Sequence, residues 1–173
     1  MPSATEAGPP QAKPGNAGTG EITAWAFYDF ANSGYTTVVI TAVFNAYFVG
    51  AVAGGGPGAW LLWTVALALS NALVLVVGPW VGQTADEHGR LKPWLALSTA
   101  LCVAGTAGLG WVGPGELLLG MALIVVSNTA FGLGENLIAA FLPRLVPPGR
   151  LGRTSAFGWT VGYLGGLLTL LAC

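Results

Sequence analysis

The chain has 173 residues, of which six are Lys or Arg and seven are Asp or Glu, whereas 54% are hydrophobic. A soluble domain carries about 25% charged residues, so the 8% found here is too few to cover its surface. The hydrophobicity excludes a disordered chain, and a net charge of -1 without a basic stripe excludes a nucleic-acid partner. An integral membrane protein remains, with the lipid bilayer as its first partner.

Residues 1–21 differ from the rest of the chain, because they are rich in Pro, Gly, Ala and Thr and contain few large apolar side chains. A secretory signal needs a basic start and an apolar core, and this segment has neither. We therefore expect a disordered cytosolic tail over residues 1–21, followed by a membrane domain over residues 22–173.

Long uncharged stretches divide this domain into candidate membrane helices. The stretch between Asp29 and Asp86 is long enough for two crossings, and the Gly- and Pro-rich residues 54–58 separate them. Continuously apolar runs without period-two alternation predict helices rather than the strands of a membrane barrel. The first helix is longer than a straight crossing requires, which predicts tilt or a part outside the lipid. We expect an all-α fold with five transmembrane helices, over residues 23–50, 59–82, 93–112, 117–140 and 155–173.

The basic residues lie on one side of this predicted topology. They occur in the tail, in the loop between the second and third helices and in the loop between the fourth and fifth: Lys13, Arg90, Lys92, Arg144, Arg150 and Arg153. Because Lys and Arg accumulate in cytosolic loops, the N-terminus is expected in the cytosol, as in a multi-pass protein of a bacterial inner membrane.

The most specific pattern is the segment GQTADEHGRLK over residues 82–92, which fits G-x-x-x-D-x-x-G-R-x-K and which we call the signature loop. Gly82 would let neighbouring helices approach closely, and Gly89 would permit a tight turn. Asp86 would accept hydrogen bonds from backbone N–H groups at the start of a neighbouring helix. Arg90 and Lys92 would hold the loop in the cytosol. The alternative is a solvated turn that happens to carry charges.

This loop resembles the signature loop of the major facilitator superfamily, at the position where that family carries it. Residues 25–34, 140–143 and 155–166 look like the branch typified by the fungal vacuolar amino-acid effluxers known for autophagy, and by their bacterial relatives. The resemblance runs from about residue 22 to the end and covers the first five of the twelve helices in such proteins. It implies most of an N-terminal six-helix bundle whose C-terminal half is missing, and a loop that latches the halves together.

Asp29 is the one charged residue inside the first predicted helix. It shares a helical face with Asn32, Ser33 and Thr36, and this polar stripe suggests the lining of an aqueous path. A carboxylate in a membrane helix usually faces a cavity or a partner, so we expect Asp29 and Asn32 to handle substrate or a proton. Alternatively, Asp29 lies at the cytosolic interface and the hydroxyl groups bond to their own helix.

Glu135 lies near the cytosolic end of the fourth predicted helix. The resemblance implies that its carboxylate pairs with Arg90 of the signature loop, because members of the superfamily often place an acidic residue there. The alternative is an interfacial carboxylate that reaches into water.

The fifth predicted helix contains glycines at four-residue spacing, which allow backbones to approach and therefore predict helix packing: Gly158, Gly162 and Gly166. Tyr163 follows Gly162 where antiporters of the superfamily carry a Gly-Pro element, so the chain shows no antiporter signature. His88, the one histidine, is expected to be a solvated residue of the signature loop.

Motifs for other chemistries are absent. The chain lacks a G-x-x-x-x-G-K-[ST] nucleotide loop, a G-x-S-x-G serine motif and an H-E-x-x-H zinc motif. Cys102 and Cys173 lie in apolar runs and predict neither a disulfide framework nor a metal site, and no cofactor is expected.

We therefore expect a secondary transporter rather than an enzyme, working by alternating access. The resemblance implies an amino acid or a similar small solute. The alternative is a membrane scaffold, a receptor or a degenerate half-transporter that acts through a partner.

Overall fold

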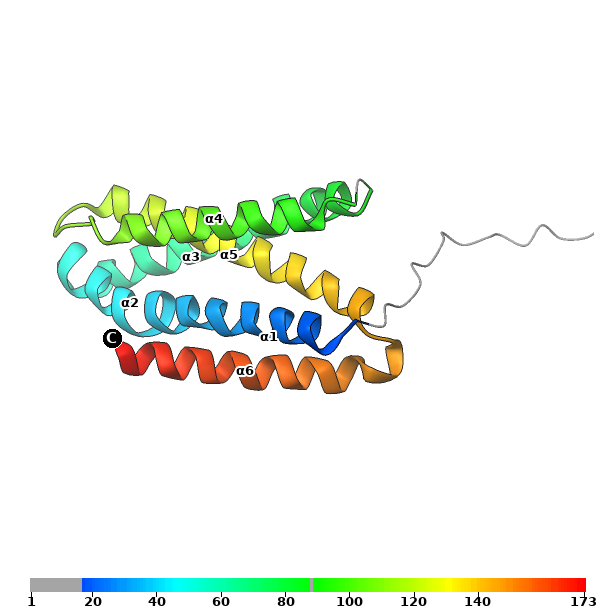
Figure 1. Cartoon of the computed structure of the whole chain (residues 1–173). Coiled ribbons are helices and arrows are strands. Elements are labelled where there is room, and N and C mark those ends of the chain that lie inside the picture. Colours follow the sequence, from blue (N-terminus) through cyan, green and yellow to red (C-terminus); the bar gives the residue numbers. More distant parts are fainter. Residues whose placement is uncertain (1–16, 88) are drawn as a thin grey trace, which may run out of the picture.

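The computed structural model describes residues 17–87 and 89–173, which form helices joined by short turns, without a strand among them. The helices join into five long rods, and Figure 1 shows these rods side by side in one bundle. The all-α fold predicted from the sequence is confirmed. Residues 1–16 of the predicted tail and His88 lie outside the described residues.

The first rod runs from Thr19 to Val52, so it extends beyond the predicted helix at both ends. It consists of α1 (Thr19–Gly34), the π-helix η1 (Tyr35–Ala42), α2 (Val43–Tyr47) and the π-helix η2 (Phe48–Val52). A helix of 34 residues is roughly 50 Å long, well beyond the ~30 Å of a hydrocarbon core. The first rod is therefore longer than a straight crossing needs.

The other rods are α3 (Pro57–Glu87), α4 (Leu91–Leu109), α5 (Leu117–Leu145) and α6 (Leu151–Ala172), and the short 3-10 helix η3 (Pro148–Arg150) precedes α6. The predicted break between the first two crossings is a turn. Gly54, Gly55 and Gly56 have φ angles of 72°, 76° and 90°, a conformation that only glycine adopts without strain.

Four of the rods are long and apolar enough to cross a membrane: Thr19–Val52, Pro57–Glu87, Leu117–Leu145 and Pro148–Ala172. These spans make the chain a multi-pass membrane protein. The fifth rod, α4, is less apolar because Lys92, Pro93 and several small polar residues belong to it. Its 19 residues nevertheless reach about 28 Å, and it lies along the other rods in Figure 1. A fifth crossing by α4 therefore stays a prediction.

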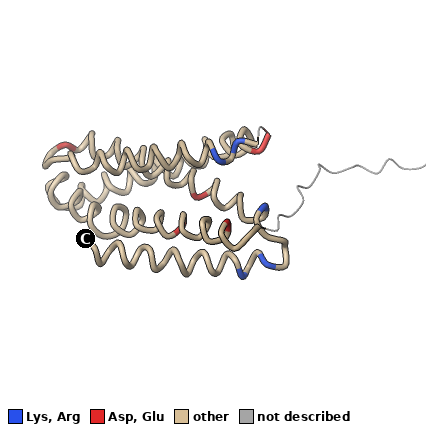
Figure 2. Tube along the Cα trace, in the orientation of Figure 1, with Lys and Arg blue, Asp and Glu red and all other residues tan. Residues whose placement is uncertain are grey.

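The rods pack in a small set of pairs, in which α1 lies along α6 while α5 lies along both α3 and α4. The main core contains Phe48, Trp63 and Ile124, and a smaller cluster around Val81 and Leu137 lies near the end of α3. Figure 2 shows Lys and Arg gathered at one end of the bundle, where α1 and α6 begin and where α3 and α5 end. The predicted basic side is thus one physical end of the molecule.

Candidate functional site

The signature loop is shorter than its motif, because α3 continues to Glu87 and α4 begins at Leu91. The N–H of Arg90 donates to the carbonyl of Ala85 at 2.8 Å, and the N–H of Gly89 donates to the carbonyl of Asp86 at 3.3 Å. These two bonds form a Schellman motif at the end of α3, with Gly89 at φ 61°. Gly89 thus makes the tight turn that the motif predicted.

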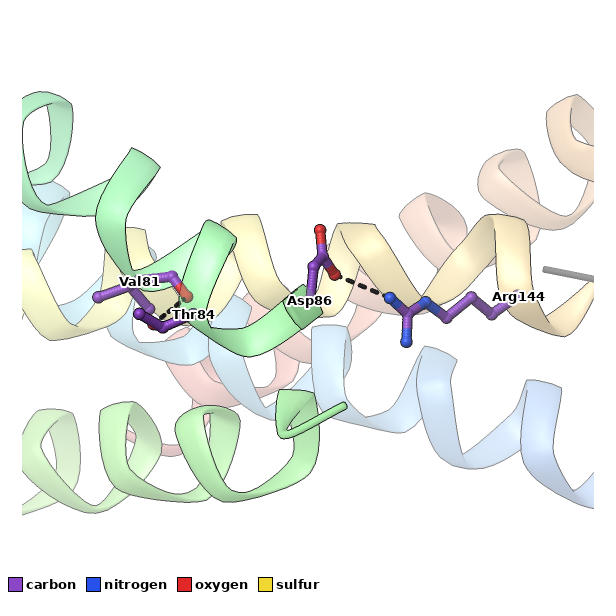
Figure 3. Close-up of polar contacts among 4 residues, drawn as sticks. All are labelled: Val81, Thr84, Asp86 and Arg144. Carbon is purple, nitrogen blue, oxygen red and sulfur yellow. Dashed lines mark hydrogen bonds and ion pairs between the residues drawn. The ribbon is translucent and has the colours of Figure 1, made fainter. Parts of the chain in front are cut away.

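Asp86 forms an ion pair with Arg144, near the end of α5. The Nη2 atom of Arg144 donates to Oδ1 of Asp86 at 2.8 Å, as Figure 3 shows. The sequence instead predicted that Asp86 accepts from backbone N–H groups at a helix start, and Arg144 was assigned only to the cytosolic loop. Asp86 lies in the last turn of α3 and meets the side chain of Arg144 instead.

The Asp86–Arg144 pair has the same spacing as another contact between α3 and α5. Ser70 contacts Asn128 and Asp86 contacts Arg144, both pairs being separated by 58 residues. Nδ2 of Asn128 donates to Oγ of Ser70 at 2.6 Å in a buried contact. The helices run parallel, so the charged end of α3 reaches the charged end of α5 without any loop bridging them.

Gly82 does not mark a close helix approach within the described chain. A Cβ at Gly82 would meet no atom within 4 Å, and Gly82 borders a cavity of about 60 Å³ between α3 and α5. The tight contact of these helices lies further along, where a Cβ at Gly132 would fall 2.8 Å from Cγ2 of Val74. The close helix contact predicted at Gly82 is therefore not made by any of the described residues.

The predicted charge partner of the loop, Glu135, contacts the first helix. Nδ2 of Asn32 in α1 donates to Oε1 of Glu135 in α5. Among the described residues the ion pair within 4 Å is Arg144 with Asp86, so the implied pairing of Glu135 with Arg90 is not made in this structure. Glu135 is partly buried, and its carboxylate accepts a hydrogen bond from the neutral amide of Asn32 instead of pairing with a cation.

Asp29 lies about ten residues into α1, roughly 15 Å from the start of the helix, and is partly buried. Its side chain rests on α6, where a Cβ at Gly162 would fall 2.5 Å from Oδ2 of Asp29. Asn32, three residues further along α1, donates to Glu135 of α5. Asp29, Asn32 and Glu135 thus form a polar cluster between α1, α5 and α6, which we call the acidic cluster.

The predicted polar stripe divides between two neighbours of α1. Asn32 faces α5, whereas Ser33 and Thr36 border a groove of about 390 Å³ between the first rod and α6. The hydroxyl of Thr37 bonds to the carbonyl of Ser33, and that of Thr41 bonds to the carbonyl of Thr36. The hydroxyl groups of Thr37 and Thr41, which continue the polar stripe along the rod, thus bond to their own helix.

The glycines of α6 pack against α1, as their spacing predicted. A Cβ at Gly158 would overlap the ring of Trp25, and one at Gly166 would fall 2.7 Å from Oγ1 of Thr37. Gly165, which interrupts the four-residue spacing, is the tightest of all, since a Cβ there would overlap the carbonyl oxygen of Phe30. Small residues let two membrane helices pack backbone to backbone, and here α1 is the partner.

Sequence reasoning missed the residues that tie α1 to α4 and α5. Nε1 of Trp25 donates to the carbonyl of Ile138 at 3.0 Å. The hydroxyl groups of Tyr28 and Thr99 lie 3.0 Å apart, and those of Tyr35 and Ser127 lie 2.9 Å apart. With Asn32, the three aromatic residues stand three or four apart on one face of the rod. That spacing is visible in the sequence, but its partners are not.

Comparison with known proteins adds one informative similarity. The chain is 32% identical over 158 residues to the uncharacterized MFS-type transporter YxiO of Bacillus subtilis (strain 168). The match covers 88% of this chain and 36% of that relative, so the chain spans about a third of the relative's length. No family model and no solved structure matches the chain. The chain is therefore similar, over most of its own length, to part of an MFS-type transporter.

Proposed function

We propose that the chain is the first part of a secondary active transporter of the major facilitator superfamily, which moves a small solute such as an amino acid by alternating access. The observation that carries this proposal is the 32% identity to an MFS-type transporter across most of the chain. In such folds the substrate sits near the membrane midplane between two repeats that rock against each other. The described bundle supplies only one side of such a site.

The proposal places the N-terminus in the cytosol of a bacterial inner membrane. Its support is the concentration of Lys and Arg at one end of the bundle in Figure 2. The signature loop and the Asp86–Arg144 pair lie at this end, so they would act on the cytosolic side.

Within this transporter, the acidic cluster is the candidate site for substrate or a proton. Ionisable residues inside membrane helices are costly to bury and mark transport pathways more often than they serve packing. Asp29 and Glu135 come from helices that the fold brings together, and Asn32 links them. No cation within 4 Å pairs with either carboxylate among the described residues, so each is free of an ion pair.

The Asp86–Arg144 pair is the candidate latch of the cytosolic end. It joins the end of α3 to the end of α5, and both side chains stay accessible, with 61% of Asp86 and 44% of Arg144 exposed. An exposed pair contributes little to folding, about 0–1 kcal/mol, so it can break and re-form during a conformational change. The Schellman turn at Gly89 fixes the backbone that presents Asp86.

The latch is testable by charge reversal. Asp86→Lys and Arg144→Glu each place like charges together and should each lower the free energy of unfolding by up to about 1 kcal/mol, whereas the double variant should recover most of the loss. Denaturant unfolding of the four proteins in detergent measures the coupling. Arg150→Glu is the matched control, since Arg150 makes no ion pair among the described residues. Additive losses in the double variant would show that the two charges are uncoupled.

Transport itself is tested with the longer protein that this proposal requires, reconstituted in vesicles. We expect amino-acid uptake that changes when a pH gradient is imposed, and no uptake by the 173-residue chain, because half the site is missing. Uptake by the 173-residue chain alone would contradict the proposed fold. Uptake of other solutes but of no amino acid would contradict only the substrate class.

A further inference from the structure

A pocket of about 300 Å³ opens between α1, α4 and α5 at the end of the bundle where Lys and Arg gather. We call it the basic-end pocket. Its two charged residues are Glu21, in the first turn of α1, and Lys92, in the first turn of α4. The rest of its lining is apolar or aromatic, so the pocket combines a charged mouth with an apolar interior.

Hydrogen bonds between the surrounding helices hold the walls of this pocket in place. Nε1 of Trp25 donates to the carbonyl of Ile138 at 3.0 Å and joins the α1 wall to the α5 wall. The hydroxyl groups of Tyr28 and Thr99 lie 3.0 Å apart and join α1 to α4 at the deeper end. Because the walls are already fixed, a ligand that enters would need to order little of the protein.

The two charges at the mouth are opposite in sign, and they do not pair with each other. Among the described residues the ion pair within 4 Å is Asp86 with Arg144, so the ammonium of Lys92 faces no carboxylate at that distance. Oε2 of Glu21 accepts from the N–H of Gly18 at 3.2 Å, which leaves Oε1 for a second donor. A ligand that carries both an anionic and a cationic group would therefore match the mouth.

The order of residues along the pocket follows the order of layers in a bilayer. Glu21 and Lys92 lie at the helix starts, and Trp25 lies four residues further along α1, roughly 6 Å deeper. Charged side chains at the surface, then tryptophan, then apolar side chains are typical of the step from lipid headgroups to hydrocarbon. A volume of about 300 Å³ is small for a ligand pocket, so it fits a headgroup and the start of an acyl chain.

We propose that the basic-end pocket binds phosphatidylethanolamine, whose headgroup carries a phosphate and a primary ammonium. The phosphate pairs with Lys92, the ammonium donates to Glu21, and the start of an acyl chain packs against Trp25 and Leu95. Phosphatidylcholine has the same charges, but its ammonium has no N–H to donate. Phosphatidylglycerol has the phosphate and no ammonium. The proposal concerns a lipid and not the solute, so it stands apart from the transport proposed above.

Native mass spectrometry of the chain in detergent, titrated with each of the three lipids, measures the affinities. The unmodified chain should bind phosphatidylethanolamine several-fold more tightly than either other lipid. Glu21→Gln should lower the affinity for phosphatidylethanolamine several-fold and should not lower that for phosphatidylglycerol, and the amide oxygen of Gln can still cap α1. Lys92→Gln should weaken binding of all three lipids. Arg150→Gln is the matched control, because Arg150 lies outside the pocket.

Equal affinities of the unmodified chain for the three lipids would overturn the proposal, as would a preference for phosphatidylethanolamine that survives Glu21→Gln. Ala24→Trp fills the pocket without a change of charge and should lower the affinity for phosphatidylethanolamine, whereas Ala96→Trp, on an exposed part of α4 outside the pocket, should not. A second measurement needs no variant. Phosphatidylethanolamine should raise the melting temperature of the unmodified chain more than phosphatidylglycerol does, and equal rises would contradict the proposal.

Discussion

Gly165→Ala is expected to loosen the α1–α6 pair more than any other single methyl group added to α6. The added Cβ would overlap the carbonyl oxygen of Phe30 and would lie 2.8 Å from both its carbonyl carbon and its Cα. These are backbone atoms, so no rotamer change can relieve the overlap, and the helices must separate. Overpacking of this kind typically costs about 1–3 kcal/mol, and a larger side chain such as Leu should cost more.

Thermal or denaturant unfolding of the chain in detergent measures this loss. Gly152→Ala is the matched control, because Gly152 lies in the same helix and a Cβ there would meet no atom within 4 Å. That change should be close to neutral, because Gly152 lies in the first turn of α6 rather than in the helix interior. Equal melting temperatures for the two variants would show that α1 and α6 do not pack as closely as described.

The sequence predicted that α6 packs through glycines, but not against which helix or at which glycine. Spacing reveals that residues share a face of one helix, and it carries no information about the helix opposite that face. Gly165 departs from the four-residue spacing of Gly158, Gly162 and Gly166, yet it meets the backbone of α1. The close contact depends on the crossing geometry of two helices, which only the folded bundle defines.

The same limit explains the polar contacts. The sequence placed Asp29 and Asn32 on one face of the first helix, and it left Glu135 either paired with the signature loop or reaching into water. The partner was assigned to Arg90 through family resemblance, whereas the structure gives Asn32. The rotation and register of α5 relative to α1 decide this choice, and they are set by packing along the whole helix.

The π-helical stretch of the first rod was also not predicted. It contains six consecutive β-branched residues, 36–41, whose side chains crowd the preceding turn of an α-helix. The hydroxyl of Thr41 bonds to a carbonyl five residues earlier, which fits the wider winding. The run of β-branched residues is visible in the sequence. Hydropathy and charge, on which the helix prediction rested, indicate only a continuous apolar helix.

The second large effect is expected at the acidic cluster, from Asn32→Asp. This change removes the amide that donates to Glu135 and puts a third carboxylate beside Glu135 and Asp29. Because all three would repel one another in a partly buried site without a cation, we expect a loss of about 1–3 kcal/mol in the free energy of unfolding. Transport by the longer protein should also fall.

The rescue variant separates this chemistry from a general packing defect. Asn32→Asp combined with Glu135→Gln restores one carboxylate and one amide with the donor and acceptor exchanged, so the hydrogen bond between α1 and α5 can form again. We expect stability to recover. Asn136→Asp adds the same charge at an exposed neighbour of Glu135 in α5, so this control should change stability little.

Transport distinguishes the two roles that remain for Glu135. If a carboxylate is needed at position 135 to carry a proton, the rescued protein folds but loses its response to a pH gradient. If Glu135 only forms the hydrogen bond between α1 and α5, folding and gradient response return together. A double variant no more stable than Asn32→Asp alone would show that the hydrogen bond between these residues does not hold the two helices together.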